Sequence, residues 1–293
     1  AGHHEDEEHH GDRGGSANLE LLEHGGHHQR AERVRAGVGI LGCQQPDHFE
    51  RIQTSDDDEH RRDHHDLPDH RQRDAEELPR GMCRIPYDWK GDPELAHAIA
   101  AEAEGQDTWI TAIDDHYLPL YYPSINMWSY LGKGNDDKRW ISVSVAQTGD
   151  MEDFMRVGRA IREAIKKVDR KVILIATGSM SHTFYPLREM RAHESSDPKH
   201  IFSDKAREMD YERLEWFKEG RHDRVLDTMP EFMTVRPEAK FAHYLMMAAA
   251  LGERNFAAPG QQISDYENSV GTSQVHVWFP RPETGWTVDR SAS

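Results

Sequence analysis

The chain has 293 residues, of which 53 are acidic and 36 basic, giving a formal net charge of −17 at pH 7. This length is enough for one large domain or two ordinary ones, whereas two cysteines exclude a disulfide framework and the acidic balance argues against nucleic acid as a partner. No apolar run of about 18 residues is present and the start lacks a signal-peptide pattern, so we expect a cytoplasmic protein that does not act at a membrane.

The first 75 residues differ in composition from the rest of the chain. They hold 12 of the 20 histidines, and Phe49 is their only aromatic residue. The same stretch carries 18 acidic and 9 basic side chains, and every basic one is Arg. So little apolar surface cannot offset the entropy lost when the backbone is ordered. Within this stretch, only AGVGILG (36–42) has the pattern of a buried strand.

From residue 76 onward the pattern becomes that of an α/β domain. PELAHAIAAEAEG (93–105) begins with Pro, is rich in Ala and stops at a glycine, which predicts a helix. WISVSV (140–145) alternates and is rich in β-formers, which predicts a strand. Residues 151–168 carry apolar side chains at helical spacing, with Arg and Lys on the other face, and this pattern predicts an amphipathic helix.

The following run, KVILIATG (171–178), is continuous and apolar, which is typical of a strand covered on both faces. Strand, helix and strand form a βαβ unit and imply a parallel pair. Further helices are predicted over about 204–219 and from Pro237 to Gly252, followed by a strand over 274–279. We therefore expect a single α/β domain with a central mixed, largely parallel sheet flanked by helices.

The junction ATGSMSH (176–182) is the most informative place for chemistry. A buried strand ends there in small residues and leads to His182 in a loop. Ligand sites in open α/β sheets lie beyond the carboxyl ends of strands, so His182 is well placed for proton transfer. The alternative is a polar loop histidine with no role.

Two further segments carry candidate residues. Glu238 stands in the first turn of a predicted apolar helix, where the helix dipole alone would also favour a carboxylate. DDHYLPLYYPSINMW (114–128) combines two carboxylates, a histidine and four aromatic residues, as a small aromatic-binding pocket would and as a core-facing loop would. Nucleotide-binding and metalloprotease motifs such as GxGxxG and HExxH are absent from the sequence.

Several of these segments together resemble one enzyme family. ATGSMSH, the helix with Glu238, EELPRGMCRIPYDWKGDPELA (76–96) and ENSVGTSQVHVWF (267–279) are similar in order and spacing to the class III extradiol ring-cleavage dioxygenases. That class includes homoprotocatechuate 2,3-dioxygenases and the catalytic subunit of protocatechuate 4,5-dioxygenase. The resemblance covers about residues 76–282.

The resemblance implies a specific chemistry. Family members hold a mononuclear Fe(II) with two histidines and one glutamate, which leaves positions open for a catecholic substrate and O₂. Glu238 matches the carboxylate ligand, and His182 matches the acid/base histidine. The ring would open next to the two hydroxyl-bearing carbons, giving a muconic semialdehyde-type product. Relatives are usually oligomers, so a homo-oligomer is implied as well.

The resemblance is incomplete in two places. Several family members carry a histidine near the position of Tyr121, and here the candidates for that role are Tyr121 itself and His116. The family's N-terminal HxP-like and D-x-H-aromatic motifs, which supply the histidine ligands, are not recognisable. His48 is the nearest approach to one iron ligand, and the other is not assigned.

Two interpretations of residues 1–75 follow from this departure. In one, the stretch is a wrong-frame reading joined to the dioxygenase domain of residues 76–282 and a tail over 283–293, and translating the upstream nucleotides in the other frames decides it. In the other, it is a genuine His- and acid-rich extension that binds metal or stays without structure. The alternative to an active dioxygenase is accordingly a catalytically impaired relative or a His-rich metal-binding protein.

Overall fold

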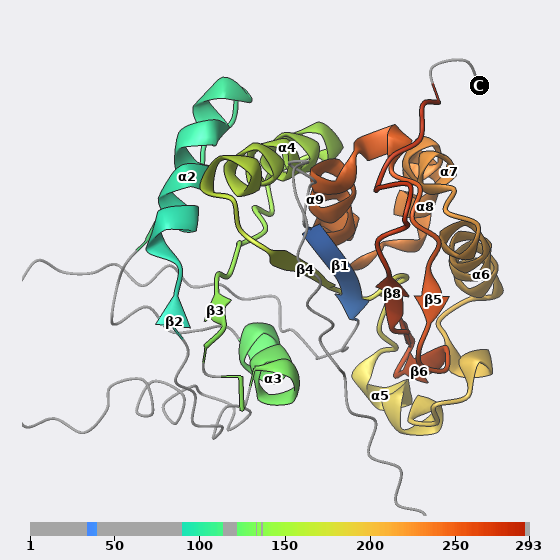
Figure 1. Cartoon of the computed structure of the whole chain (residues 1–293). Helices are drawn as coiled ribbons and strands as arrows, with labels where there is room; N and C mark the ends of the chain where they lie inside the picture. Colours follow the sequence, from blue (N-terminus) through green and yellow to red (C-terminus); the bar gives the residue numbers. More distant parts are fainter. Residues whose placement is uncertain (1–33, 40–89, 114–121, 133, 136, 291–293) are drawn as a thin grey trace, which may run out of the picture. The chain divides into compact units, whose positions relative to one another are not determined.

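Strands from distant parts of the chain form the main sheet (Figure 1). The computed structural model describes residues 34–39, 90–113, 122–132, 134–135 and 137–290, all within one unit, Glu32–Ser293. The strands are β1 (Val34–Gly39), β2 (Lys90–Gly91), β3 (Arg139–Trp140), β4 (Val172–Thr177), β5 (Gln261–Gln262), β6 (Glu267–Ser269), β7 (Thr272–Gln274) and β8 (Val277–Phe279). The helices are α2 (Pro93–Gly105), α3 (Tyr122–Leu131), α4 (Met151–Val168), α5 (Leu187–Met190), α6 (Asp204–Lys218), α7 (His222–Asp227), α8 (Met229–Phe232) and α9 (Ala242–Leu251).

The main sheet has four strands in the order β4-β1-β8-β5. β1 runs parallel to β4 and antiparallel to β8, and β8 runs antiparallel to β5. The predicted α/β class and the mixed sheet are confirmed, but a large parallel sheet is not found among the described residues. The strand predicted over 36–42 is present as β1, which begins two residues earlier and ends three residues earlier than predicted.

The predicted βαβ unit is wrong in its pairing. β3 pairs with β2, and β4 pairs with β1, so the two strands that flank α4 do not pair with each other. The strand expected over 140–145 also ends early, at Trp140. Residues 142–144 are exposed, and within the described ranges no second strand lies beside them to complete a ladder. Alternation along the sequence was therefore not sufficient to make a strand.

Two other strands differ from their predictions in extent or environment. β4 forms as expected, but the side chain of Ile173 is 57% exposed, so the expectation that both faces are covered is wrong at that position. The strand predicted over 274–279 is divided into the end of β7 and all of β8. β7 pairs with β6 in a separate hairpin, whereas β8 joins the main sheet.

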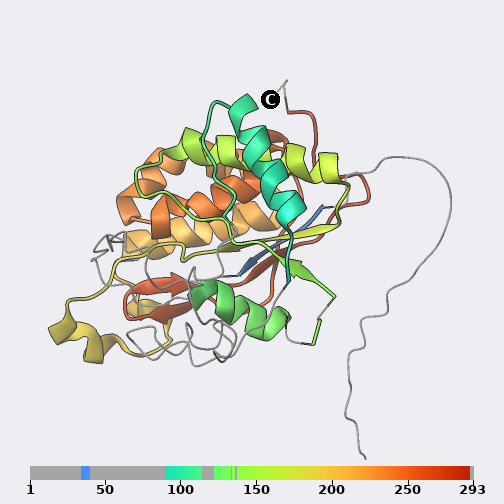
Figure 2. The same ribbon diagram turned by 90° about the vertical axis from the view of Figure 1, so that its left-hand side faces the viewer.

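The helix predicted over 151–168 is confirmed as α4, because its ends carry strong local signals. Asp150 accepts a hydrogen bond from the Asp153 amide and Asp153 accepts one from the Asp150 amide, which is a capping box. The buried face of α4 packs against α2 and α9. Figures 1 and 2 show α4 and α9 together on one face of the main sheet.

α4 and α9 approach each other closely at Gly158. A Cβ atom built there would lie 2.3 Å from the carbonyl oxygen of Met246, so only glycine fits at this crossing. Apart from His243, α9 is apolar on every side, and nearly all of its residues are buried. It forms the centre of the core, which also takes in Phe217 and Phe279 from α6 and β8.

The helix expected over 204–219 is confirmed as α6, which ends one residue early, at Lys218. Ser203 caps it by accepting a hydrogen bond from the amide of Ala206 at 3.1 Å. No helix within the described residues is long and apolar enough to cross a membrane.

A neutral histidine is enclosed in the core at the start of α7. His222 has no exposed surface, stacks on Phe256 with ring centroids 3.7 Å apart, and places Nε2 2.9 Å from the carbonyl oxygen of Ala258. Because that oxygen can only accept, Nε2 carries the proton and Nδ1 accepts from the hydroxyl of Tyr244 at 2.8 Å. Burial is the main reason that the pKa of His222 falls to about 3.

His222 should therefore make the folded state sensitive to acid. Between pH 6.5 and about 3 the unfolded chain binds a proton at this ring that the folded protein does not. As the pH is lowered through this range, His222 therefore decreases the free energy of unfolding by about 1.4 kcal/mol per pH unit. We expect His222→Gln to remove this slope in urea unfolding at pH 7, 6 and 5. His97→Gln, at an exposed position on α2, supplies the control for a histidine-to-glutamine change outside the core. An equal slope in the parent chain and His222→Gln contradicts the assignment.

Candidate functional site

The loop that follows β4 carries His182 against a second segment, residues 236–238. The backbone amide of His182 donates to the carbonyl oxygen of Arg236 at 3.1 Å, and Ser181 forms an isolated antiparallel bridge with Pro237. His182 therefore lies beyond the carboxyl end of β4, as its position in the sequence predicted, and its backbone is fixed to the residues that precede Glu238.

Glu238 lies before α9 and not in its first turn. Ala239, Lys240 and Phe241 all have positive φ values, of 47°, 57° and 61°, and α9 begins only at Ala242. The prediction that Glu238 lies in the first turn of the helix is thus wrong. The helix dipole therefore does not explain why a carboxylate stands at this position. The backbone turns sharply at these residues in a conformation that non-glycine residues adopt at a cost.

The carboxylate of Glu238 is held on the His182 loop. Its Oε2 accepts a hydrogen bond from the amide of Ser179 at 2.5 Å. Its own amide lies 3.3 Å from the carbonyl oxygens of both Ser179 and Met180. The carboxylate of Glu238 thus links its own segment to the His182 loop, although Ser179 and Glu238 lie 59 residues apart in the sequence.

The imidazole of His182 faces this carboxylate. Nε2 of His182 lies 4.0 Å from Oε2 of Glu238, and the two side chains are 14% and 21% exposed. Nε2 is buried and has no hydrogen-bond partner in the part of the chain that the structure describes. Phe184 contacts the ring edge-on, with centroids 4.8 Å apart. A ligand or a substrate hydroxyl could supply the hydrogen-bond partner that this enclosed nitrogen lacks.

A third group, His243, joins the pair and was not singled out by the sequence. It lies in the first turn of α9, and its ring rests against Gly178: a Cβ atom built on Gly178 would lie 2.4 Å from Nδ1 of His243. The close approach therefore requires glycine at this point of the loop. The available signal was one histidine inside the otherwise apolar helix FAHYLMMAAAL, on the face that meets the end of β4.

Both histidines of this cluster favour the neutral form. Burial is the largest cause that lowers the pKa of His182, the Arg236 guanidinium lowers it further, and the Glu238 carboxylate opposes both. Burial also lowers the pKa of His243, Glu238 opposes this effect, and His182 adds to it. The cluster therefore contains one carboxylate and two imidazoles that influence one another electrostatically.

This donor set fits part of a metal site. A partly exposed carboxylate beside neutral imidazoles is suitable for a divalent metal that accepts oxygen and nitrogen ligands. Among the described residues, however, no three His, Cys, Asp or Glu side chains are arranged to hold a metal ion. Glu238 is the one carboxylate of this cluster that could serve as a ligand. The predicted ligand His48 lies outside the described residues.

The other predicted site residues also lie outside the described ranges. Tyr121 and His116 belong to the segment 114–121, for which no structure is described. The remainder of the aromatic segment forms α3, in which the side chain of Trp128 is buried. The question of whether the segment binds an aromatic ligand thus stays open as a prediction.

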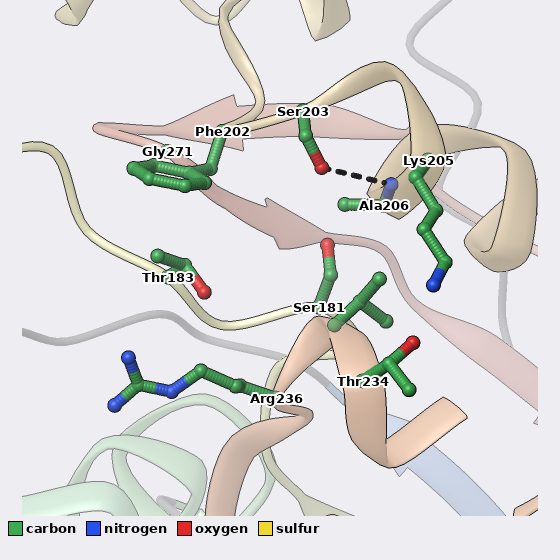
Figure 3. A pocket seen from close by; sticks show the side chains of 10 residues that line it. Ser181, Thr183, Phe202, Ser203, Lys205, Ala206, Thr234, Arg236 and Gly271 are labelled. Atoms are coloured by element: carbon green, nitrogen blue, oxygen red, sulfur yellow. Dashed lines mark hydrogen bonds between the residues drawn. The ribbon is translucent and has the colours of Figure 1, made fainter. Parts of the chain in front are cut away.

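A cavity of about 250 Å³ borders the His182 loop (Figure 3). Ser181 and Thr183, the residues on either side of His182, line it together with Phe202, Lys205 and Arg236. Neither His182 nor Glu238 lines it. The cavity is therefore separate from the place where the imidazole and the carboxylate meet.

Comparisons with known proteins bear on this cluster. A family model described as the catalytic LigB subunit of aromatic ring-opening dioxygenase matches residues 61–280. The chain is 29% identical over 189 residues to a 3,4-dihydroxyphenylacetate 2,3-dioxygenase of Escherichia coli, over 64% of this chain and 59% of the relative. It is 27% identical over 122 residues to a 2-aminophenol 1,6-dioxygenase beta subunit of Pseudomonas sp, over 41% of this chain and 39% of the relative. The matches thus span less than two thirds of either relative.

Proposed function

Because the chain belongs to the family of catalytic LigB subunits of aromatic ring-opening dioxygenases, we propose that it is an extradiol dioxygenase that opens a catecholic ring with O₂. The observation that carries the proposal is the pairing of His182 with Glu238, whose Nε2 and Oε2 atoms lie 4.0 Å apart at the end of β4. The resemblance to the family implies an acid/base role for His182 and a metal-ligand role for Glu238, and the fold brings the two residues together from distant segments.

In this proposal His182 accepts a proton from a catechol hydroxyl. Its lowered pKa keeps the ring neutral near pH 7, and its buried Nε2 is available to accept a proton. The nearby carboxylate of Glu238 stabilises the imidazolium that forms, and the protonated ring can return the proton later in the reaction. Phe184 packs against the imidazole in a T-shaped contact, with ring centroids 4.8 Å apart.

Glu238 is proposed as the carboxylate ligand of Fe(II), with His48 as one of the two histidine ligands. When bound, the metal would bring the two substrate oxygens and O₂ together and supply the redox chemistry that protein side chains lack. The Ser179 amide fixes one carboxylate oxygen of Glu238, so the orientation of the ligand is set by the loop. Tyr121 or His116 would supply a second polar group near the substrate.

The proposed reaction adds both atoms of O₂ to the substrate. The ring bond that breaks lies next to the two hydroxyl-bearing carbons, and the product is a muconic semialdehyde-type acid with a visible absorption band. The relatives are named for 3,4-dihydroxyphenylacetate and 2-aminophenol, so an aromatic ring with two adjacent OH or NH₂ substituents is the substrate class to test. A homo-oligomer in the cytoplasm completes the proposal.

The deciding experiment is anaerobic loading with Fe(II), followed by a candidate substrate and then air. Catechol, 3,4-dihydroxyphenylacetate and 2-aminophenol form the panel, and O₂ uptake and the visible spectrum are recorded together. We expect one O₂ consumed per molecule of ring-opened product with at least one of them. If the loaded chain binds Fe(II), Zn(II) or Ni(II) but consumes no O₂ with any substrate, the protein is a metal-binding relative and the proposal is wrong.

A further inference from the structure

A buried carboxylate lies behind the His182 loop, on the central part of α6. Asp210 has no exposed surface. Its Oδ1 accepts from the backbone amide of Ser181 at 3.1 Å, and its Oδ2 accepts from the hydroxyl of Ser181 at 2.6 Å. A single side chain thus holds both the main chain and the side chain of the residue that precedes His182.

The other neighbours of Asp210 belong to the β6–β7 hairpin and the segment before it. The hydroxyl of Tyr266 donates to Oδ2 at 2.7 Å. Ser273 on β7 donates its amide to the carbonyl oxygen of Ser181 at 3.0 Å, and the hydroxyl of Ser181 lies 3.2 Å from that of Ser273. Ser181 is therefore fixed through its amide, its carbonyl and its hydroxyl, by two separate elements.

This arrangement is costly for stability. Burial raises the pKa of Asp210 to about 6, against the opposing effect of its hydrogen bonds. Within the described residues no cation forms an ion pair with it, so hydroxyl and amide donors alone replace the water that it loses. An apolar residue at this core position would avoid that cost, so the feature calls for an explanation other than stability.

The explanation lies on the opposite side of the same loop. Ser181 also forms the bridge to Pro237, and the amide of the next residue, His182, donates to the Arg236 carbonyl. The Asp210 contacts therefore fix one of the residues through which the His182 loop meets the segment that ends at Glu238. A shift of Ser181 would change the distance between Nε2 of His182 and Oε2 of Glu238.

We propose that Asp210 is a positioning residue, which clamps Ser181 and thereby directs the imidazole of His182 at Glu238 and the substrate. The proposal rests on the proposed function for the role of His182, whereas the clamp itself is a structural statement that can be measured without turnover. Asp210 does not touch the reacting atoms, and it acts only through Ser181.

The chain offers a matched control on the same helix. Arg213, three residues further along α6, is equally enclosed, but its guanidinium donates to the carbonyl oxygens of Met209 and Thr228 and lies over the ring of Phe232. Its contacts lead away from the His182 loop. Asp210→Asn and Arg213→Gln each disturb a buried polar group of α6, and only the first disturbs Ser181.

The first measurement is amide hydrogen exchange of the metal-free protein. We expect Asp210→Asn to speed exchange in residues 177–183 and to leave residues 228–235 close to the parent, and Arg213→Gln to show the reverse pattern. Ser181→Ala, which removes only the hydroxyl, should give a smaller effect at the same residues. Unchanged exchange over 177–183 in Asp210→Asn overturns the clamp, whether or not the chain turns over a catechol.

The second measurement is steady-state kinetics of the Fe(II)-loaded variants, well below their unfolding temperatures. A misplaced proton acceptor should lower kcat of Asp210→Asn by about 10- to 100-fold, with KM for the catechol within about twofold. Arg213→Gln should keep the kcat of the parent. If the parent is active and Asp210→Asn matches it, positioning is refuted; if the parent itself is inactive, the proposed function fails and the exchange data still decide the clamp.

Discussion

Replacing Glu238 by glutamine should remove tight Fe(II) binding and, with it, ring cleavage. The amide keeps the size of the side chain and an oxygen that can accept from the Ser179 amide, so the loop geometry is retained. What is lost is the negative charge that a divalent metal needs from this ligand. Changing a residue that only hydrogen-bonds to a metal ligand already costs about 10- to 100-fold in affinity, so we expect loss of a ligand to cost at least about 100-fold.

The measurement is an anaerobic Fe(II) titration of Glu238→Gln beside the parent chain. Glu231→Gln is the matched control, since this exposed glutamate on α8 lies seven residues earlier and away from the His182 loop. Equal Fe(II) affinity in Glu238→Gln and the parent would show that the carboxylate is not a ligand. In that case the pairing with His182 would need another explanation.

Replacing His182 by glutamine should leave Fe(II) bound and greatly slow turnover. General acid–base groups contribute about 10²- to 10⁴-fold to rates, and the Nε2 of His182 is the buried imidazole nitrogen without a partner among the described residues. We therefore expect kcat to fall within that range while the Fe(II) affinity changes little. This separation of metal binding from turnover distinguishes the role of His182 from that of Glu238.

A catechol that is already ionised gives a sharper test of the same residue. A nitro-substituted catechol loses its first proton near neutral pH, so its binding needs less help from a base, and His182→Gln should bind it with less loss than catechol itself. His193→Gln is the control, because His193 is also a partly buried histidine that follows β4. Its ring stacks on Tyr185 and forms a hydrogen bond with His200, so it has different partners from His182. An equal penalty for both substrates would argue against proton acceptance by His182.

The longer helices α2, α4 and α6 could be predicted from the sequence because their signals are local. The capping box at Asp150 and the cap at Ser203 are complete within a few residues, and α4 and α6 begin where those signals stand. Strands depend on partners far along the chain. Residues 141–145 alternate well but have no neighbour for a ladder in the described structure, and the strand expected over 274–279 is divided between two sheets.

Part of the candidate site could be predicted from the sequence, and part could not. His182 follows a strand end, and its resemblance to a family motif identified it together with Glu238. The close pairing of these residues, by contrast, rests on contacts between the His182 loop and residues 236–238, about 55 positions further along the chain, which no sequence pattern indicated. His243 and Asp210 were missed because each acts through a contact with a distant segment, Gly178 in one case and Ser181 in the other.

The place of β1 in the main sheet has a consequence for how the chain folds. β1 lies between β4 and β8, so residues near position 36 pair with partners near 174 and 279. Such long sequence separations slow folding, because the entropy of closing long loops is lost before the contacts form. During synthesis β1 can meet β4 well before the last strand exists, but its other edge stays unpaired until residues 277–279 have left the ribosome. The sheet beside the His182 loop is therefore among the last parts of the fold to be completed.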